Sequence, residues 1–276
     1  MKSDDFGDRM KLFEQAEAGR RCLPLLPICV RLDGKGFSKW TKHLERPFDQ
    51  RLSNLMVDVA SFLVEETHAK ISYTQSDEIS LIYYQPNFES EVYFDGKIQK
   101  LTSVLASMAT AKFNYLAPKV FMTGHAERAG LAFFDCRVWV LPNQVEAANT
   151  LLWREKDAAK NSISMAARHY YSHNELHEKS GSEMQEMLFQ KGVNWNDYPD
   201  FFKRGTFVRR ETYKTELDTE TLAKIPEGKR PAPGTLFERS HVVKIMMPPF
   251  TKVINRVGVI FNGESPKTED PTVIKE

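Results

Sequence analysis

The sequence has few cysteines and no long apolar run. Its three cysteines, Cys22, Cys29 and Cys136, form no CxxC pair, which argues against a disulfide framework and against a thiolate zinc site. No apolar run reaches the roughly 18 residues that a membrane-spanning helix needs. The charged start MKSDDFGDRMKLFEQAEAGRR also lacks the apolar segment of a signal peptide. These absences predict a reduced, cytoplasmic protein without a membrane partner.

A strong charge of one sign is missing as well. The chain carries 38 Lys and Arg residues against 37 Asp and Glu, a formal net charge of +1. It therefore has no global basic field to hold nucleic acid nonspecifically, and such a partner must be held by local patches. With 276 residues, of which 41% are hydrophobic, the chain can bury a core as one large domain or two small ones.

Strand-like and helix-like segments alternate over the first 142 residues. Strand patterns cover residues 27–34, 70–75, 78–84 and 131–142. Helical spacing covers residues 47–66, where Asp49 is placed to cap the helix, and residues 97–116. This order predicts an α+β, ferredoxin-like β-α-β-β-α-β fold with a hairpin around Ser76. The last strand is apolar on both sides, which predicts a central place in the sheet.

The remainder of the chain has a different pattern. Helical spacing runs from about residue 145 to 171 and over 182–192, and a strand pattern covers 241–247. The last residues lack an apolar pattern and contain prolines, which predicts a flexible tail. We therefore predict a catalytic domain at residues 1–142, a C-terminal helical and β extension that binds RNA at 143–262, and a tail at 263–276.

Two acidic turns carry the strongest chemical signal. Asp33 ends the first strand and Asp77 lies at the bend of the hairpin, and the ferredoxin-like order places these strands side by side. Magnesium prefers oxygen ligands, and two carboxylates with phosphate oxygens are its usual setting. Gly34 and Gly36 let the backbone approach a ligand, and amides there are suited to hold phosphate. Two ordinary turns are the alternative, and their pairing at matching strand ends favours the metal site.

Nucleotide chemistry also requires positive side chains. Six are expected to flank the acidic site: Arg31, Lys35, Lys42, Arg46, Lys97 and Lys100. For each of them a solvated surface position is the alternative.

Further along the chain, cations alternate with aromatic residues. The group comprises Lys203, Arg204, Arg209, Arg210 and Lys214, with Phe207 and Tyr213. This pattern suits an RNA backbone and equally an edge strand guarded by charge. Three histidines at four-residue steps, His169, His173 and His177, are interpreted as a polar or RNA-facing surface rather than a zinc site. Asp135 is expected to be structural and paired with a basic residue.

Five motifs, VRLDGKGFSKW, YTQSDEIS, FDCRVWVLP, LLWREKDAAKNS and FKRGTFV, occur in this order. In order and approximate spacing they resemble the tRNA-His guanylyltransferase family and its 3′-to-5′ polymerase relatives, over about residues 6–261. The resemblance implies a polymerase-like palm and a magnesium-dependent nucleotidyltransferase that adds nucleotides to the 5′ end of tRNA, in tRNA repair or in tRNA-His guanylylation. It also implies GTP and ATP as substrates and a homotetramer.

The same resemblance implies which residues form the site. Asp33 and Asp77, together with the Gly34 carbonyl, are similar to the ligands of two magnesium ions, and Glu78 is similar to a third catalytic acidic residue. The implied nucleotide-binding residues are Asp33, Gly34, Lys35, Gly36, Phe37, Ser38, Arg46, Ser76, Asp77, Lys97 and Lys100.

One departure from the family concerns the substrate. Eukaryotic members carry a His-Ile-Asn-Asn motif where this chain reads AKNS at residues 159–162. That motif is associated with selection of tRNA-His, and its absence resembles bacterial and archaeal members that act on 5′-truncated tRNAs.

Two functions of other classes are the alternatives. A palm-type nucleotide cyclase would need no RNA surface, and a noncatalytic RNA-binding ferredoxin-like module would give the two aspartates no reason to converge.

Overall fold

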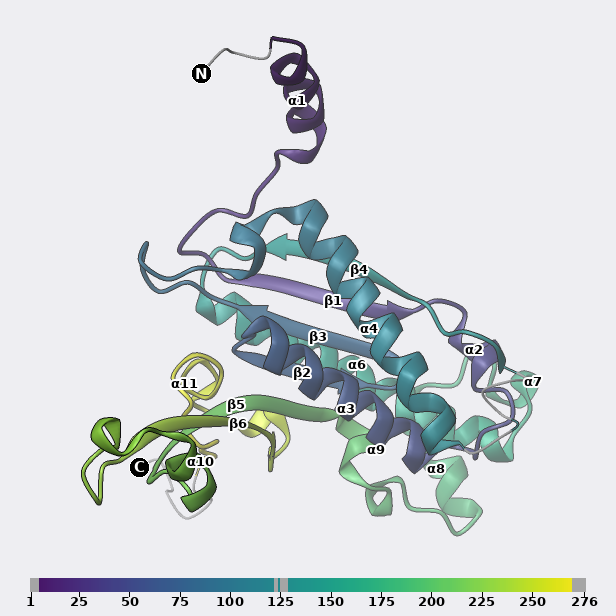
Figure 1. Cartoon of the computed structure of the whole chain (residues 1–276). Coiled ribbons are helices and arrows are strands. Elements are labelled where there is room, and N and C mark those ends of the chain that lie inside the picture. The colour runs from purple at the N-terminus through teal and green to yellow at the C-terminus, as the bar shows by residue number, and fades with distance from the viewer. Residues whose placement is uncertain (1–4, 122–123, 125–128, 270–276) are drawn as a thin grey trace, which may run out of the picture.

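The computed structural model describes residues 5–121, 124 and 129–269. A six-stranded sheet lies at its centre, with all neighbouring strands antiparallel and the order β4-β1-β3-β2-β5-β6 (Figure 1). The strands are β1 Ile28–Gly34, β2 Ile71–Gln75, β3 Glu78–Tyr83, β4 Phe134–Val140, β5 Thr206–Thr215 and β6 Phe237–Ile245.

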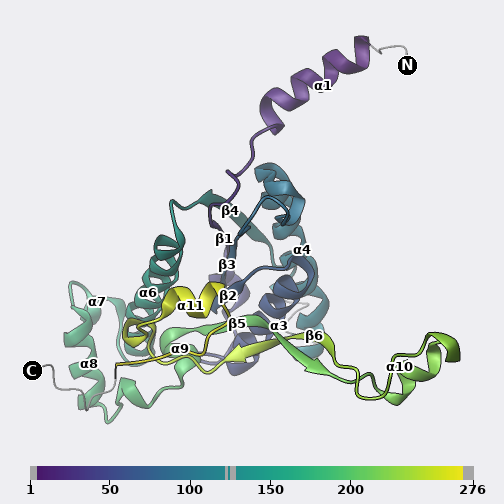
Figure 2. The same cartoon turned by 90° about the vertical axis from the view of Figure 1, so that its left-hand side faces the viewer.

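Helices cover both faces of this sheet. α3 and α4 lie on one face, and α6 and α11 lie on the other (Figure 2). The α-helices are α1 Asp5–Ala18, α2 Phe37–Trp40, α3 Gln50–Thr67, α4 Ile98–Val120, α6 Gln144–Tyr170, α7 His173–Leu176, α8 Gly181–Gln190, α9 Asp200–Arg204, α10 Thr219–Lys224 and α11 Arg256–Phe261. Short 3₁₀ turns are η1 Tyr93–Gly96, η2 Trp195–Asp197, η3 Glu227–Lys229 and η4 Phe250–Lys252.

Strand β1 shows why both faces are buried. Val30 and Leu32 belong to the apolar cluster formed with α3 and α4, whereas Cys29 belongs to the cluster that contains Leu151 of α6. Successive residues of a strand point to opposite faces, so an apolar run such as ICV requires cover on both sides. Each large apolar side chain buried in this way contributes about 1.5–3 kcal/mol. The two layers of helices are thereby held against the sheet.

The predicted ferredoxin-like order is confirmed, and α3 begins where expected. Asp49 accepts a hydrogen bond from the Arg51 amide at 2.9 Å and caps the helix. The predicted central position of the strand at residues 131–142 is wrong, because β4 lies at the edge of the sheet and pairs only with β1 in the described part of the chain. Its side chains are apolar on both sides because α4 and α6 cover both faces of the sheet.

The C-terminal region continues the same sheet. Its helical patterns are confirmed as α6 and α8, and its strand pattern is confirmed as β6. β5 pairs with β2, and the β5–β6 hairpin extends beyond the sheet to the segment that contains α10 (Figure 2). The division of the chain at residue 142 stays a prediction. Within the predicted tail, the Ile254 amide donates to the Lys267 carbonyl at 2.9 Å, and residues 270–276 lie outside the described residues.

Helix α1 projects away from the body of the protein, and none of its residues is buried (Figures 1 and 2). Its base is attached near the start of α4, where the Ile98 amide donates to the Arg20 carbonyl at 3.1 Å. None of the helices in the described ranges is long and apolar enough to span a membrane.

Candidate active site

Three carboxylates form a row across neighbouring strands. Asp33 on β1 lies opposite Glu78 on β3 and opposite Asp135 on β4. Residues directly opposite each other point to the same face of a sheet, so the three carboxylates share a face. Leu32, the neighbour of Asp33, points to the face covered by α3 and α4. Asp33 therefore points to the other face, which α6 covers.

The hairpin turn brings a further carboxylate to this row. The Gly34 amide donates to the Asp77 carbonyl at 3.1 Å, so the end of β1 is tied to the turn between β2 and β3. The structure thus brings Asp33 and Asp77 together, as the sequence predicts. Ser76 adopts a left-handed conformation at φ 54°, which closes the two-residue turn.

The carboxylates line a cavity of about 340 Å³ between the strand ends and α6, called here the carboxylate cavity. A separate and larger cavity, of about 450 Å³, lies at the other end of the sheet. The lining residues of the carboxylate cavity are Asp33, Gln75, Ser76, Asp77, Glu78, Arg154, Asn161, Ser164, Met165 and Arg168. Burial, followed by the charges of Asp33 and Glu78, raises the pKa of Asp77 to about 6. A cation in the cavity would favour the ionised form of Asp77.

Arg154 of α6 engages both oxygens of Glu78. Its Nε donates to Oε1 at 2.6 Å and its Nη2 donates to Oε2 at 2.7 Å, and each side chain is only 14% exposed. The guanidinium also lies 4.6 Å from the ring of Trp153, and Arg31 lies 5.8 Å from the same ring. Glu78 is therefore oriented by a bidentate ion pair, which links α6 to β3. Sequence reasoning missed this pair, because its members are 76 residues apart.

Arg137 is a second cation that sequence reasoning missed. Its Nη2 lies 3.3 Å from a carboxylate oxygen of Asp135 and 3.8 Å from one of Asp33. The expected pairing of Asp135 with a basic residue is confirmed. A signal was present in the sequence, because residues 135 and 137 are two apart in a strand and so share a face.

The loop after Asp33 differs from expectation in two respects. The Gly34 and Lys35 amides donate to the Asp77 and Phe133 carbonyls, so these two amides are engaged within the protein rather than open to phosphate. The Phe37 side chain is 4% exposed and packs among Trp40, Phe113 and Phe134, so it belongs to the core. A Cβ on Gly34 would lie 2.3 Å from the Phe37 ring, which explains the glycine. Gly36 has φ +66°, and Lys35 and Ser38 are exposed.

Metal ligation at this site would need oxygens from more than side chains. Across the described ranges, no three His, Cys, Asp or Glu side chains gather closely enough to hold a metal ion by themselves. Asp33, Asp77 and a backbone carbonyl such as that of Gly34 are a donor set that magnesium completes with water and substrate phosphates.

Comparison with known proteins identifies the family. The profile of the tRNAHis guanylyltransferase family matches residues 7–142. The tRNA(His) guanylyltransferase of Schizosaccharomyces pombe is 31% identical over 222 residues, which are 75% of this chain and 82% of that protein. The chain belongs to the tRNA(His) guanylyltransferase family. The predicted enzyme class, a nucleotidyltransferase that acts at the 5′ end of tRNA, is thereby confirmed.

Solved structures of the family agree with the fold. A bacterial tRNA(His) guanylyltransferase (Thg1)-like protein in complex with ATP has a TM-score of 0.69 and 39% identity, and the match covers 74% of this chain and 88% of that one. Such a protein in complex with GTP has a TM-score of 0.68 and 34% identity, with coverage of 90% and 95%. The predicted palm-type fold is confirmed by this similarity.

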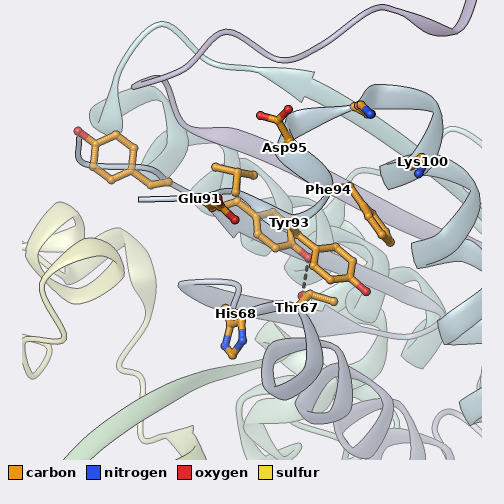
Figure 3. Close-up of a pocket in the computed structure, with 11 residues that line it drawn as sticks. Thr67, His68, Glu91, Tyr93, Phe94, Asp95 and Lys100 are labelled. Carbon is orange, nitrogen blue, oxygen red and sulfur yellow. Dashed lines mark hydrogen bonds between the residues drawn. The ribbon is translucent and has the colours of Figure 1, made fainter. Parts of the chain in front are cut away.

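In this guanylyltransferase-family chain, two of the predicted phosphate-binding cations lie far from the carboxylates. Lys97 and Lys100 line the cavity of about 450 Å³ beside Tyr93 and Phe94 (Figure 3). This cavity lies where β3 ends at Tyr83, whereas Asp77 precedes the start of β3. The expectation that these lysines flank the carboxylates within one chain is therefore not met, and their role in binding phosphate stays a prediction.

The remaining predicted cations lie on or near the first strand and its loop. Arg31 shares the face of Asp33 on β1. Lys35, Lys42 and Arg46 are exposed in the loop that follows β1, and Arg46 donates to the Thr41 carbonyl at 3.2 Å. Among the residues that the structure describes, none of these four cations lines the carboxylate cavity.

The basic group in the C-terminal region of this family member is mostly structural. Arg209 is 5% exposed and donates to the Val259 and Glu264 carbonyls at 3.2 and 2.7 Å. Arg210 donates to the Glu65 carbonyl and the Ser240 hydroxyl. Lys203 and Arg204 pair with Asp200 of α9, and Phe207 is buried in the core. Phe207 and Arg209 pair with both β2 and β6, so the edge-strand interpretation is wrong for this part of β5. Contact of the exposed Tyr213 and Lys214 with RNA stays a prediction.

The three histidines are exposed, as expected for a polar surface. They do not share one helix, because α6 ends at Tyr170 and α7 begins at His173. His173 and His177 have ring centroids 6.2 Å apart.

Proposed function

We propose that the carboxylate cavity is the site of nucleotidyl transfer and that Asp33 and Asp77 hold two magnesium ions there. The observation that carries this proposal is the hydrogen bond between the Gly34 amide and the Asp77 carbonyl, which holds the two carboxylates in one cavity. The donor set fits magnesium, since both side chains supply oxygen and burial disfavours the charge of Asp77 without a cation. When bound, magnesium lowers the pKa of an attacking hydroxyl and neutralises the departing pyrophosphate.

The chain's own residues orient the reactants. Asp33 and Asp77 supply negative charge at the ends of two rigid strands, and the turn at Ser76 forms one wall of the cavity. Glu78 has both oxygens engaged by Arg154. We therefore assign Glu78 a positioning role, in which it fixes α6 over the cavity, in place of the predicted catalytic role.

The substrate we propose is a tRNA that lacks its first 5′ nucleotides, extended in the 3′-to-5′ direction with ATP, GTP and the other nucleoside triphosphates. The solved bacterial relatives in complex with ATP and GTP support this choice. The absence of a histidine at residue 159 supports it as well, because Ala159 has no polar side-chain group to read a base. Nucleotides would be selected by pairing with the 3′ side of the acceptor stem.

The experiment is incubation of the protein and magnesium with several 5′-truncated tRNA transcripts and each labelled nucleoside triphosphate, with the products sized on a gel. We expect comparable repair of different tRNAs, with the nucleotide that pairs with the opposite strand. A strong preference for full-length tRNA-His, with guanosine added whatever base opposes it, would refute this choice of substrate. Turnover of nucleotide without RNA would instead indicate a cyclase.

The cytoplasmic location predicted from the sequence, and the homotetramer implied by the resemblance, also remain proposals. Two features support an oligomer: the uncovered α1, and the position of Lys97 and Lys100 away from the carboxylates of their own chain. The mass in solution, measured by light scattering, tests it.

A further inference from the structure

Helix α6 presents one continuous face to the carboxylate cavity. The α6 residues that line it are Arg154, Asn161, Ser164, Met165 and Arg168. They follow steps of seven, three, one and three residues, which keeps all of them on one side of an α-helix. From Arg154 to Arg168 this face is about 21 Å long, at 1.5 Å per residue. The cavity is therefore bordered by one rigid helix along its length.

The two arginines at the ends of this face have different surroundings. Arg154 is 14% exposed and is neutralised by Glu78 and Asp157. Arg168 is exposed and, among the residues that the structure describes, has no carboxylate within ion-pair distance. An arginine that lines a cavity with three carboxylates and pairs with none of them is suited to an anion brought by a ligand.

We infer that Arg168 binds a phosphate group of the substrate, at the end of α6 away from Arg154. The inference rests on the proposed function, which brings two sources of phosphate to this cavity: the incoming nucleoside triphosphate and the RNA. Arg168 fits either source, because its planar guanidinium matches two phosphate oxygens at once. Asn161 and Ser164 lie between Arg154 and Arg168 on the same face of α6 and supply neutral hydrogen-bonding groups to a ligand in the cavity.

The test is steady-state kinetics of the full-length Arg168→Gln variant on a 5′-truncated tRNA. One arm varies the nucleoside triphosphate at saturating RNA, and the other varies the RNA at saturating nucleotide. A lost charge-assisted contact is expected to raise one of the two KM values about tenfold or more. A rise confined to the nucleotide KM identifies the triphosphate as the source. A rise confined to the RNA KM, with a shallower salt dependence of RNA binding, identifies the RNA backbone or 5′ end.

The matched control is Lys156→Gln. Lys156 is exposed on the same helix and does not line the cavity, so both KM values should stay within about twofold of the wild type. If Arg168→Gln leaves both KM values unchanged, or raises them no more than Lys156→Gln does, the inference is overturned. A fall in kcat alone would also overturn it, because that result indicates a structural effect.

Failure of the proposed function would be recognised separately. If the wild type extends no tRNA, equilibrium binding of labelled ATP, labelled GTP and the tRNA transcript still compares Arg168→Gln with the wild type. Weaker binding of one of these by the variant supports the phosphate site whatever the reaction. Equal binding of all three, or no binding by the wild type, overturns it.

Discussion

The paired strands β1 and β3 have different surroundings at their two ends. At one end Asp33 lies opposite Glu78. At the other end Ile28 lies opposite Tyr83, which lines the cavity that contains Lys97 and Lys100. The two ends are five residues apart along each strand, about 17 Å. One end has the carboxylates that suit a metal ion, and the other has two of the cations expected to bind phosphate. The two groups of the predicted site therefore lie at different ends of the sheet in one chain, and the first predictions below change one end at a time.

The largest effect is expected at the carboxylate end. Asp33→Ala and Asp77→Ala should each abolish nucleotide addition, because each removes a proposed magnesium ligand. Neither should lower the free energy of unfolding, since removing one of several neighbouring negative charges relieves repulsion. Rates of addition under saturating magnesium and denaturant unfolding curves measure the two quantities. Asp135→Ala is the matched control, because Asp135 lies opposite Asp33 and outside the cavity lining. Near-normal rates for either of the first two variants would disprove the magnesium assignment.

A smaller loss is expected when the ion pair beside the cavity is broken. Arg154→Met leaves the Glu78 carboxylate without its partner next to Asp33 and Asp77, so it should lower the free energy of unfolding by about 1–3 kcal/mol and the rate about tenfold or more. Asp157 is the more exposed partner of Arg154, with 39% of its side chain exposed. Asp157→Asn should therefore change the free energy of unfolding by only about 0–1 kcal/mol.

A double-mutant cycle of Glu78→Gln with Arg154→Met measures the coupling between these residues. A positioning role requires the two single variants to lose similar activity. If Glu78→Gln is as inactive as Asp77→Ala while Arg154→Met remains active, then Glu78 takes part in the chemistry directly.

At the opposite end, Lys100→Ala should weaken the use of nucleoside triphosphate or of 5′-triphosphate RNA about tenfold or more, with less effect on tRNA binding. Arg46→Ala, in the loop that follows β1 at the carboxylate end, is expected to have the same effect. Lys119→Ala, an exposed lysine on the same helix as Lys100, is the control. Unchanged kinetics with every nucleotide would return Lys100 and Arg46 to the surface alternative.

Mixing variants shows whether the two ends work across subunits. If Lys100 of one chain serves the carboxylates of another, an oligomer formed from Asp77→Ala and Lys100→Ala chains together should regain activity that neither variant has alone. No gain on mixing, with both variants impaired separately, would place both roles within one chain.

The sequence predicted features that depend on nearby residues and missed those that depend on distant ones. The Asp49 cap and the hairpin at Asp77 are local, and both were predicted. Helical spacing predicted the helix that contains Lys100, but not at which end of the sheet that helix begins. Arg209 was grouped with cations that suit RNA, but it donates to the carbonyls of Val259 and Glu264, which follow it by 50 and 55 residues.

The smallest effect concerns Glu155, a buried carboxylate without a place in either cavity. It is 4% exposed and accepts hydrogen bonds from the Phe250 amide at 3.0 and 2.9 Å, and burial raises its pKa above the usual 4.5. The folded state therefore binds the carboxyl proton of Glu155 more tightly than the unfolded state does. The free energy of unfolding of the wild type should fall as the pH rises from 4.5 through the raised pKa. Glu155→Gln does not titrate at this position, and the stability of the wild type relative to this variant should decrease from pH 4.5 upward, as measured by denaturant unfolding. Since Glu155 lies outside the carboxylate cavity, magnesium should leave that decrease unchanged. A stability difference that stays constant with pH would show that burial does not control the charge of Glu155.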